Sequence, residues 1–150
     1  MIDAATNEPT AQKISKGAVI LWEKFEFFAS GEQKDSRFLI LSDCHPQYKS
    51  FLAIRATTKT GFYEKPSGMI REFIIIPGKR EKPLPEKSVI DLARIVTLDW
   101  TVIGPILGDK IKEIGSVSDE LIKDIDRLVA SSKTIRRDWK KWILNSPKQK

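Results

Sequence analysis

The residue types that most often carry catalysis are scarce in this chain of 150 residues, and this narrows the chemistry available to it. The single histidine, His45, and the single cysteine, Cys44, cannot supply a conventional zinc site. A Ser-His-Asp triad would have to use His45, but no GxSxG sequence accompanies it, and we interpret His45 as a loop residue before Pro46. The phosphate-loop sequences GxGxxG and GxxxxGK(S/T) do not occur. Hydrolysis or group transfer would therefore use Arg, Lys, Glu, Asp, Thr or Ser side chains.

The elements that must position these side chains are short strands over most of the chain. Apolar alternation or continuous apolar runs predict strands at 18–27, 38–41, 51–56 and 70–76. A further short strand is expected within 88–98, and a strand or turn within 104–114 that stops at Gly115. Polar segments at 29–36, 57–61 and 79–87 predict loops and turns. This succession of short strands favours a small closed barrel or a sandwich.

The last third of the chain changes to a helical period. Ser116 and Ser118 are suitable caps, and acidic residues follow them where a helix dipole favours anions. An apolar stripe then repeats at three- and four-residue steps and predicts an amphipathic helix. The stripe can be followed through Ile143, which fits either one long helix or two helices with a break at Ser131–Ser132.

The charge of the chain is concentrated near its C-terminus. The net charge is +6, and the segment from Lys133 onward has seven basic residues and one acid, Asp138. Such a tail is either a solvated helix face or, with Trp139 and Trp142 beside it, a surface for RNA. We expect a leader at 1–15 that is disordered, one domain at 16–145 and a flexible tail at 146–150. A single cysteine, with neither a signal peptide nor a long apolar run, favours the cytoplasm.

An ordered series of short motifs extends from about residue 16 to residue 132. It begins with a Gly-led hydrophobic strand at 17–25, an E-Q-x-x-x-R loop at 32–37, the strand FLILS at 38–42 and the Thr-rich turn ATTKTG at 56–61. It continues with D-x-x-R at 91–94, VTLD at 96–99 and a closing segment at 111–132. In order and spacing, the series resembles the MazF/PemK family, the ribonuclease toxins of bacterial type II toxin–antitoxin systems. The chain has Ala18, Phe38 and Leu92 where the family has Asp, Pro and Gln.

The resemblance implies a fold, a reaction and partners. The fold would be mainly β with α: a small SH3-like β-barrel of the CcdB/MazF type with a C-terminal helix, assembled as a homodimer. The reaction would be the cleavage of single-stranded RNA by its own 2′-hydroxyl, with no metal and no other cofactor. The products would carry a 2′,3′-cyclic phosphate and a 5′-hydroxyl. The partner would be a cognate acidic antitoxin whose extended tail blocks the RNA groove.

The resemblance also assigns roles to residues. Matched to the family motifs, the catalytic residues are Arg37, Thr57 and Glu32. A guanidinium fits two phosphate oxygens and stays charged, a threonine hydroxyl adds a hydrogen bond, and a glutamate serves either as base or to hold the arginine. We assign substrate binding to Thr58, Lys59, Lys34 and Asp91.

Other interpretations remain open at this point. The chain can instead be a CcdB-like toxin that binds DNA gyrase without catalysis, in which case Trp142 and Ile143 matter more than Arg37. It can also be a degenerate binding module, which is what Phe38 and Leu92 would suggest. Asp91 has a structural alternative as well, an ion pair with Arg94.

Overall fold

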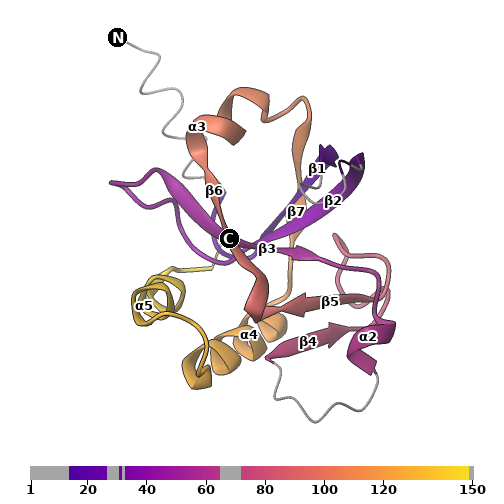
Figure 1. Ribbon diagram of the computed structural model, residues 1–150, viewed down its shortest axis with the longest axis vertical. Helices are drawn as coiled ribbons and strands as arrows, with labels where there is room; N and C mark the ends of the chain where they lie inside the picture. Colours follow the sequence, from indigo (N-terminus) through magenta and orange to yellow (C-terminus); the bar gives the residue numbers. More distant parts are fainter. Residues whose placement is uncertain (1–13, 27–30, 32, 65–71, 149–150) are drawn as a thin grey trace.

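A computed structural model describes residues 14–26, 31, 33–64 and 72–148 of the chain, and Figure 1 shows its elements. The protein is mainly β, with two helices at the C-terminal end. Most of the expected leader at 1–15 lies outside the described residues, as do Glu32 and residues 149–150 of the expected tail. In chain order the elements are β1 (Ala18–Glu26), β2 (Gln33–Ile40), β3 (Ser50–Ala56), α2 (Gly61–Glu64), β4 (Phe73–Ile76), β5 (Ser88–Asp91), η1 (Leu92–Arg94), β6 (Ile95–Asp99), α3 (Trp100–Ile103), η2 (Gly104–Ile106), β7 (Ile111–Ser116), α4 (Asp119–Ser131) and α5 (Arg137–Asn145).

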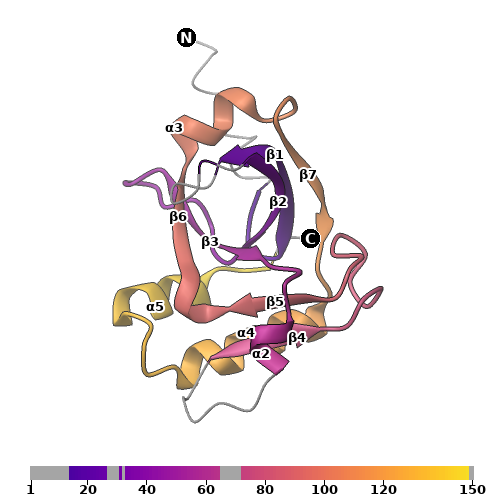
Figure 2. The ribbon, with the colours of Figure 1, turned by 45° about the vertical axis from the view of Figure 1, so that its right-hand side comes forward.

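The strands form two antiparallel sheets. The larger sheet has five strands in the order β6-β3-β2-β1-β7, and the smaller one is the β4–β5 pair. Thr57 pairs with Val89 just beyond the end of β3, which joins the two sheets. Within the described residues β6 and β7 do not pair with each other, so the closed barrel expected from the strand pattern is not formed. Figure 2 shows that the sheet curls and that its two edge strands, β6 and β7, are connected through α3 and η2, which span the distance between them.

Both faces of the larger sheet are buried because its central strands are apolar on both sides. On β3, Leu52 and Ile54 face a first core that includes apolar residues of β4, β5, α4 and α5. Phe51 and Ala53 face the opposite way, into a second core that includes Ile103 of α3. Ile14 is buried in the second core, so the packed part of the chain begins before residue 16.

Serine residues flank the first of the two C-terminal helices at both ends and follow the second, whereas the second is preceded by Arg136. Ser118 caps α4 by accepting a hydrogen bond from the amide of Leu121, as the sequence predicted. The helix ends at Ser131, and α5 is a separate helix, so of the two alternatives the two-helix one is confirmed. Both helices lie on the side of the sheet that holds the first core (Figure 1). None of the described helices is long and apolar enough to cross a membrane.

Three boundaries differ from the sequence-based expectation. β2 begins at Gln33, inside the segment 29–36 that was expected to be a loop, because its polar residues pair with the end of β1. The segment 88–98 contains two strands, β5 and β6, separated by η1. β7 passes through Gly115 instead of stopping there, since this glycine adopts a φ of 144° where the pairing of β1 with β7 shifts register.

Candidate functional site

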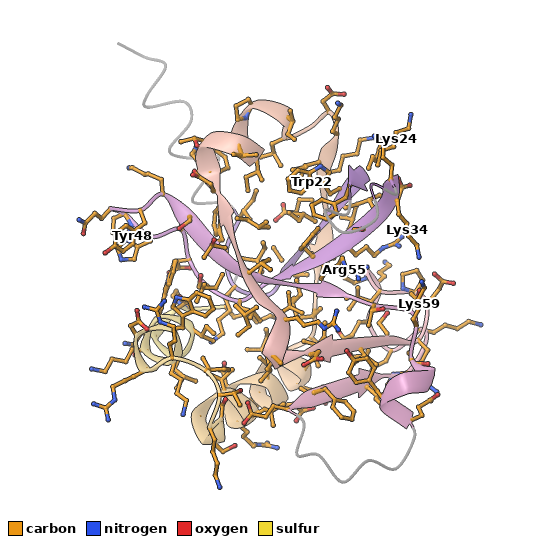
Figure 3. The ribbon with its side chains drawn as sticks, in the orientation of Figure 1. Trp22, Lys24, Lys34, Tyr48, Arg55 and Lys59 are labelled. Carbon is orange, nitrogen blue, oxygen red and sulfur yellow. The ribbon has the colours of Figure 1, made fainter. Side chains whose placement is uncertain are left out.

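A cleft of about 340 Å³ lies where β2, the end of β3 and the loop before β5 meet. Four cationic side chains line it, together with two carboxylates and several hydroxyl groups. The cations are Lys34, Arg37, Arg55 and Lys59, and the carboxylates are Asp35 and Glu86. Figure 3 shows Lys34, Arg55 and Lys59 on the same side of the molecule. The cleft therefore has an excess of positive charge, which suits a phosphate or another anion.

Arg37 is held in the middle of a strand. Its backbone lies between Leu21 of β1 and Ala56 of β3, so the loop-to-strand junction expected from the sequence is wrong. Since side chains alternate along β2, Arg37 shares a face with Leu39 while Phe38 points the other way. The Nε atom of Arg37 is buried, and among the described residues it has no hydrogen-bond partner. A buried donor without a partner is costly, and an anion in the cleft would remove that cost.

Thr57 lies one residue beyond Ala56, the cross-strand neighbour of Arg37. Its amide donates to the carbonyl of Val89 over 3.1 Å, and the amide of Val89 donates back over 2.8 Å. The Thr57 hydroxyl oxygen accepts a hydrogen bond from the amide of Lys59 at 3.2 Å. This leaves the hydroxyl proton to donate to a ligand, from a backbone that both sheets hold in place.

Arg55 adds a second guanidinium group to the cleft. It lines the cleft from β3, opposite Phe38 in the register. Burial lowers the pKa of Arg55, the charge of Arg94 lowers it further, and Tyr63 opposes the shift. The guanidinium is thus partly removed from water at the border between the cleft and the groove that Arg94 lines.

A second, larger groove of about 920 Å³ adjoins the cleft and shares Arg55, Thr57 and Lys59 with it. Its walls include an aromatic cluster made of Trp22, Phe25 and Phe38. The ring centroids of Phe25 lie 5.1 Å from those of Trp22 and 5.3 Å from those of Phe38. Phe38 is 3% exposed and belongs to the second core. This departure from the family pattern is thus accommodated on the face opposite Arg37.

The structure brings together five of the seven residues assigned to the site from the sequence. Arg37, Thr57, Thr58, Lys59 and Lys34 all line the cleft. Glu32 lies outside the described residues, and its assignment stays a prediction.

Asp91 lies in the neighbouring groove, and its carboxylate is already engaged. Its Oδ2 accepts a hydrogen bond from the Tyr63 hydroxyl at 2.8 Å, and its Oδ1 accepts one from the amide of Ala93 at 2.9 Å. Arg94 forms an ion pair with it at 3.7 Å, which confirms the structural alternative named above. These contacts give Asp91 a structural role at the start of η1.

Sequence reasoning missed Arg55, Asp35 and Glu86. For Arg55 a signal was present, since it is the one charged residue in the otherwise apolar segment FLAIRA. Asp35 is fixed in place because its Oδ1 accepts the amide of Lys24, which has a φ of 53° at a bulge in β1. In the described part of the chain no group of three His, Cys, Asp or Glu side chains is placed to bind a metal ion.

His45 lies in a different region from the cleft. Its Nδ1 accepts hydrogen bonds from the amides of Gln47 and Tyr48, which confirms it as a loop residue.

No model of a known protein family matches the chain, and no curated protein matches it either. The MazF/PemK resemblance therefore depends on the ordered motifs of the sequence alone.

Proposed function

We propose that the chain is a MazF/PemK-like toxin, an endoribonuclease that cleaves single-stranded RNA without a metal ion. The observation that carries the proposal is a cationic cleft lined by both Arg37 and Thr57, in which the buried Nε of Arg37 has no hydrogen-bond partner among the described residues. The motif series assigned these two residues to one site although twenty positions separate them in the sequence. The strand register pairs Arg37 with Ala56, the residue before Thr57, and Arg37 and Thr57 both line the cleft.

The cleft has groups for each step of such a reaction. The RNA 2′-hydroxyl attacks the adjacent phosphorus and passes its proton to a carboxylate, while the bond from phosphorus to the 5′-oxygen breaks and that oxygen takes a proton from an ammonium group. Arg37 would donate two hydrogen bonds to the oxygens of the pentavalent phosphorane, and Thr57 would add a neutral one. Asp35 and Glu86 are the carboxylates that line the cleft, and Glu32 is the one that the family resemblance supplies. Lys34 and Lys59 are ammonium groups at the same site.

The expectations of an SH3-like barrel, a homodimer and an antitoxin partner belong to the same proposal. The curled five-stranded sheet with β4–β5 beside it would be an open form of the SH3-like barrel of these toxins, in a homodimeric cytoplasmic protein. An acidic antitoxin tail would compete with RNA for Lys34, Arg37, Arg55 and Lys59. Because all four are cations, one acidic segment can neutralise the site.

The other two interpretations gain no support from the described residues. A gyrase-binding toxin was expected to use Trp142 and Ile143, yet Ile143 is fully buried and the Trp142 indole donates to the carbonyl of Asp43. A degenerate module was suggested by Phe38 and Leu92, yet both are core residues and the cations of the cleft are retained.

The test is the cleavage of a single-stranded RNA by the purified chain in EDTA. We expect fragments with a 2′,3′-cyclic phosphate and a 5′-hydroxyl, identified by mass spectrometry. Arg37→Ala should lower the cleavage rate by about 100- to 1,000-fold, the usual cost of losing one preorganised donor to an oxyanion. Arg127→Ala is the matched control, since this exposed arginine lies on α4 away from the cleft.

Two results would contradict the mechanism: cleavage that EDTA abolishes, or full activity in a folded Arg37→Ala variant. Growth arrest without RNA cleavage would favour the gyrase-binding alternative.

A further inference from the structure

A tyrosine stands exposed on a face of the protein that the cleft does not use. Tyr48 lies in the loop between β2 and β3 and is 66% exposed. Figure 3 shows it on the opposite side of the molecule from Lys34 and Lys59. No part of the proposed reaction at the cleft involves it.

The Tyr48 ring is exposed, but a neighbouring ring holds it in place. The His45 imidazole stacks on it, with ring centroids 4.4 Å apart and an interplanar angle of 29°. His45 is itself fixed, because its Nδ1 accepts the amides of Gln47 at 3.1 Å and Tyr48 at 3.2 Å. The edge of the Trp142 ring supports His45 from α5 at 5.2 Å. A preorganised ring loses little entropy when a planar ligand stacks on it.

A hollow of about 380 Å³ lies next to this stack, between residues 43–46 and α5. Lys141, Trp142 and Asn145 line it from the helix, and His45 lines it from the loop. The hollow thus combines aromatic edges with an ammonium group and an amide that can both donate and accept hydrogen bonds.

The surrounding surface is cationic. Arg137 and Lys141 are exposed one turn apart on α5, and Lys49 is exposed beside Tyr48. Three carboxylates lie nearby: Asp43, which lines the hollow, Asp138, and Asp99, which acts with Lys49 on the Cys44 thiol. Asp43 and Asp138 each have a cationic neighbour. Asp138 forms an ion pair with Arg136 at 2.9 Å, and burial raises the pKa of Asp43 against the opposing charge of Lys16.

We propose that this face, made of Tyr48, His45 and the exposed cations of α5, binds single-stranded RNA outside the cleft. One base stacks on Tyr48, and neighbouring phosphates contact Lys141 and Arg137. An exposed, fixed aromatic ring beside cations is how proteins hold single strands without reading their sequence. An acidic protein or a lipid surface would use the cations but would not need the ring. The inference rests on the proposed function for the identity of its ligand, since the cleft would act on the same RNA.

The experiment measures binding of a fluorescein-labelled 2′-O-methyl oligonucleotide to the full chain by fluorescence anisotropy. This probe has no free 2′-hydroxyl, so cleavage plays no part and the result does not depend on whether the cleft is catalytic. Tyr48→Ala should weaken binding about 5- to 100-fold, the range found for losing one base-stacking ring, and Tyr48→Phe should retain it. Tyr48→Leu keeps an apolar contact with His45 but no stacking face, and should behave like Tyr48→Ala.

The contribution of charge needs its own control. Lys141→Glu and Lys123→Glu make the same change in net charge at exposed lysines on α5 and α4. We expect the larger loss of affinity in Lys141→Glu. The proposal is overturned if folded Tyr48→Ala binds like wild type, or if the two charge reversals have equal effects. It is also overturned if phosphatidylserine vesicles bind this face and the oligonucleotide does not.

Discussion

Two regions of this protein treat their buried or half-buried charges in opposite ways. In the seam where the loops contact the C-terminal helices, which we define by Lys16, Glu72 and Glu81, each charge has several partners. Lys16 is 2% exposed, lies 2.9 Å from Oδ1 of Asp126 and donates to the carbonyl of Ile143. Glu81 is 3% exposed and accepts both the amide and the hydroxyl of Ser118.

In the cleft, by contrast, the Nε of Arg37 has no hydrogen-bond partner among the described residues. The difference separates two uses of charge within one small fold. Partnered charges join elements, so their loss should reduce stability. The cations of the cleft are arranged for a ligand, so their loss should reduce binding or rate and leave stability almost unchanged.

The largest effect on stability, and so the strongest test of this contrast, is expected from a substitution at Lys16. Lys16→Met should lower the free energy of unfolding by about 3 kcal/mol, because it leaves Asp126 and the Ile143 carbonyl without their cation. This loss is at the low end of the range for buried ion pairs for two reasons. Asp126 is one-third exposed, and its Oδ1 faces the Lys16 ammonium group as an ion pair without the geometry of a hydrogen bond. Urea denaturation measures it.

Lys148→Met is the control for Lys16→Met, because it removes a lysine paired with the exposed Asp119 and should cost less than about 1 kcal/mol. Equal losses in the two variants would contradict the distinction between the seam and an ordinary surface pair.

A smaller effect is expected at Glu72, and it depends on pH. Burial acts to raise the pKa of this carboxyl, but hydrogen bonds from the Ser132 and Thr134 hydroxyls and from the amide of Lys133 bring the pKa below its ordinary value of 4.5. The folded pKa is thus the lower one, so the stabilisation is complete above 4.5 and is lost as the pH falls through the folded value. Glu72→Gln should cost about 1 kcal/mol at neutral pH.

The measurement for Glu72 is thermal unfolding at several pH values between neutral and acid. The difference between wild type and Glu72→Gln should shrink as the solution is acidified below 4.5. A difference that stays constant with pH would show that the carboxylate charge is not what holds the connection between α4 and α5.

The smallest effect on stability is expected in the cleft. Lys59→Ala should change the free energy of unfolding by less than about 0.5 kcal/mol, because the side chain is exposed. It should weaken binding of the 2′-O-methyl oligonucleotide, and the slope of log affinity against log salt should fall by about 0.7 for one lost phosphate contact. Lys79→Ala, at an exposed lysine outside the cleft, should leave the slope unchanged. A loss of stability without a change in slope would place Lys59 with the structural charges.

Much of the fold could be predicted because local signals agreed with the packing. The apolar runs of β1 and β3 fill the cores on both faces of the sheet. The Ser118 cap and the apolar stripe after it gave α4, and the two serines at 131–132 marked where the helix ends.

What could not be predicted depended on contacts distant in sequence. The polar start of β2 has no strand signal of its own and becomes a strand by pairing with β1 across a bulge. The open sheet depends on α3 and η2, whose few residues have no clear period. Lys16 was expected as the first residue of the domain, but its sequence context gives no sign of the contacts with Asp126 and with the Ile143 carbonyl. Arg37 and Thr57 could be assigned because both belong to the motif series, and the register then pairs Arg37 with Ala56 next to Thr57. Arg55 belongs to no motif, and its one signal is a charge inside an apolar strand.

The pairing of Thr57 with Val89 has a consequence for how this position can evolve. Both hydrogen bonds between the two residues use backbone atoms, so the joint between the sheets does not depend on the threonine side chain. Serine at this position would keep both the joint and a hydroxyl, whereas valine would keep the joint and remove the hydroxyl. At this residue the backbone thus joins the sheets and the side chain supplies the hydroxyl. Substitutions during evolution can therefore remove or restore the hydroxyl without changing the fold.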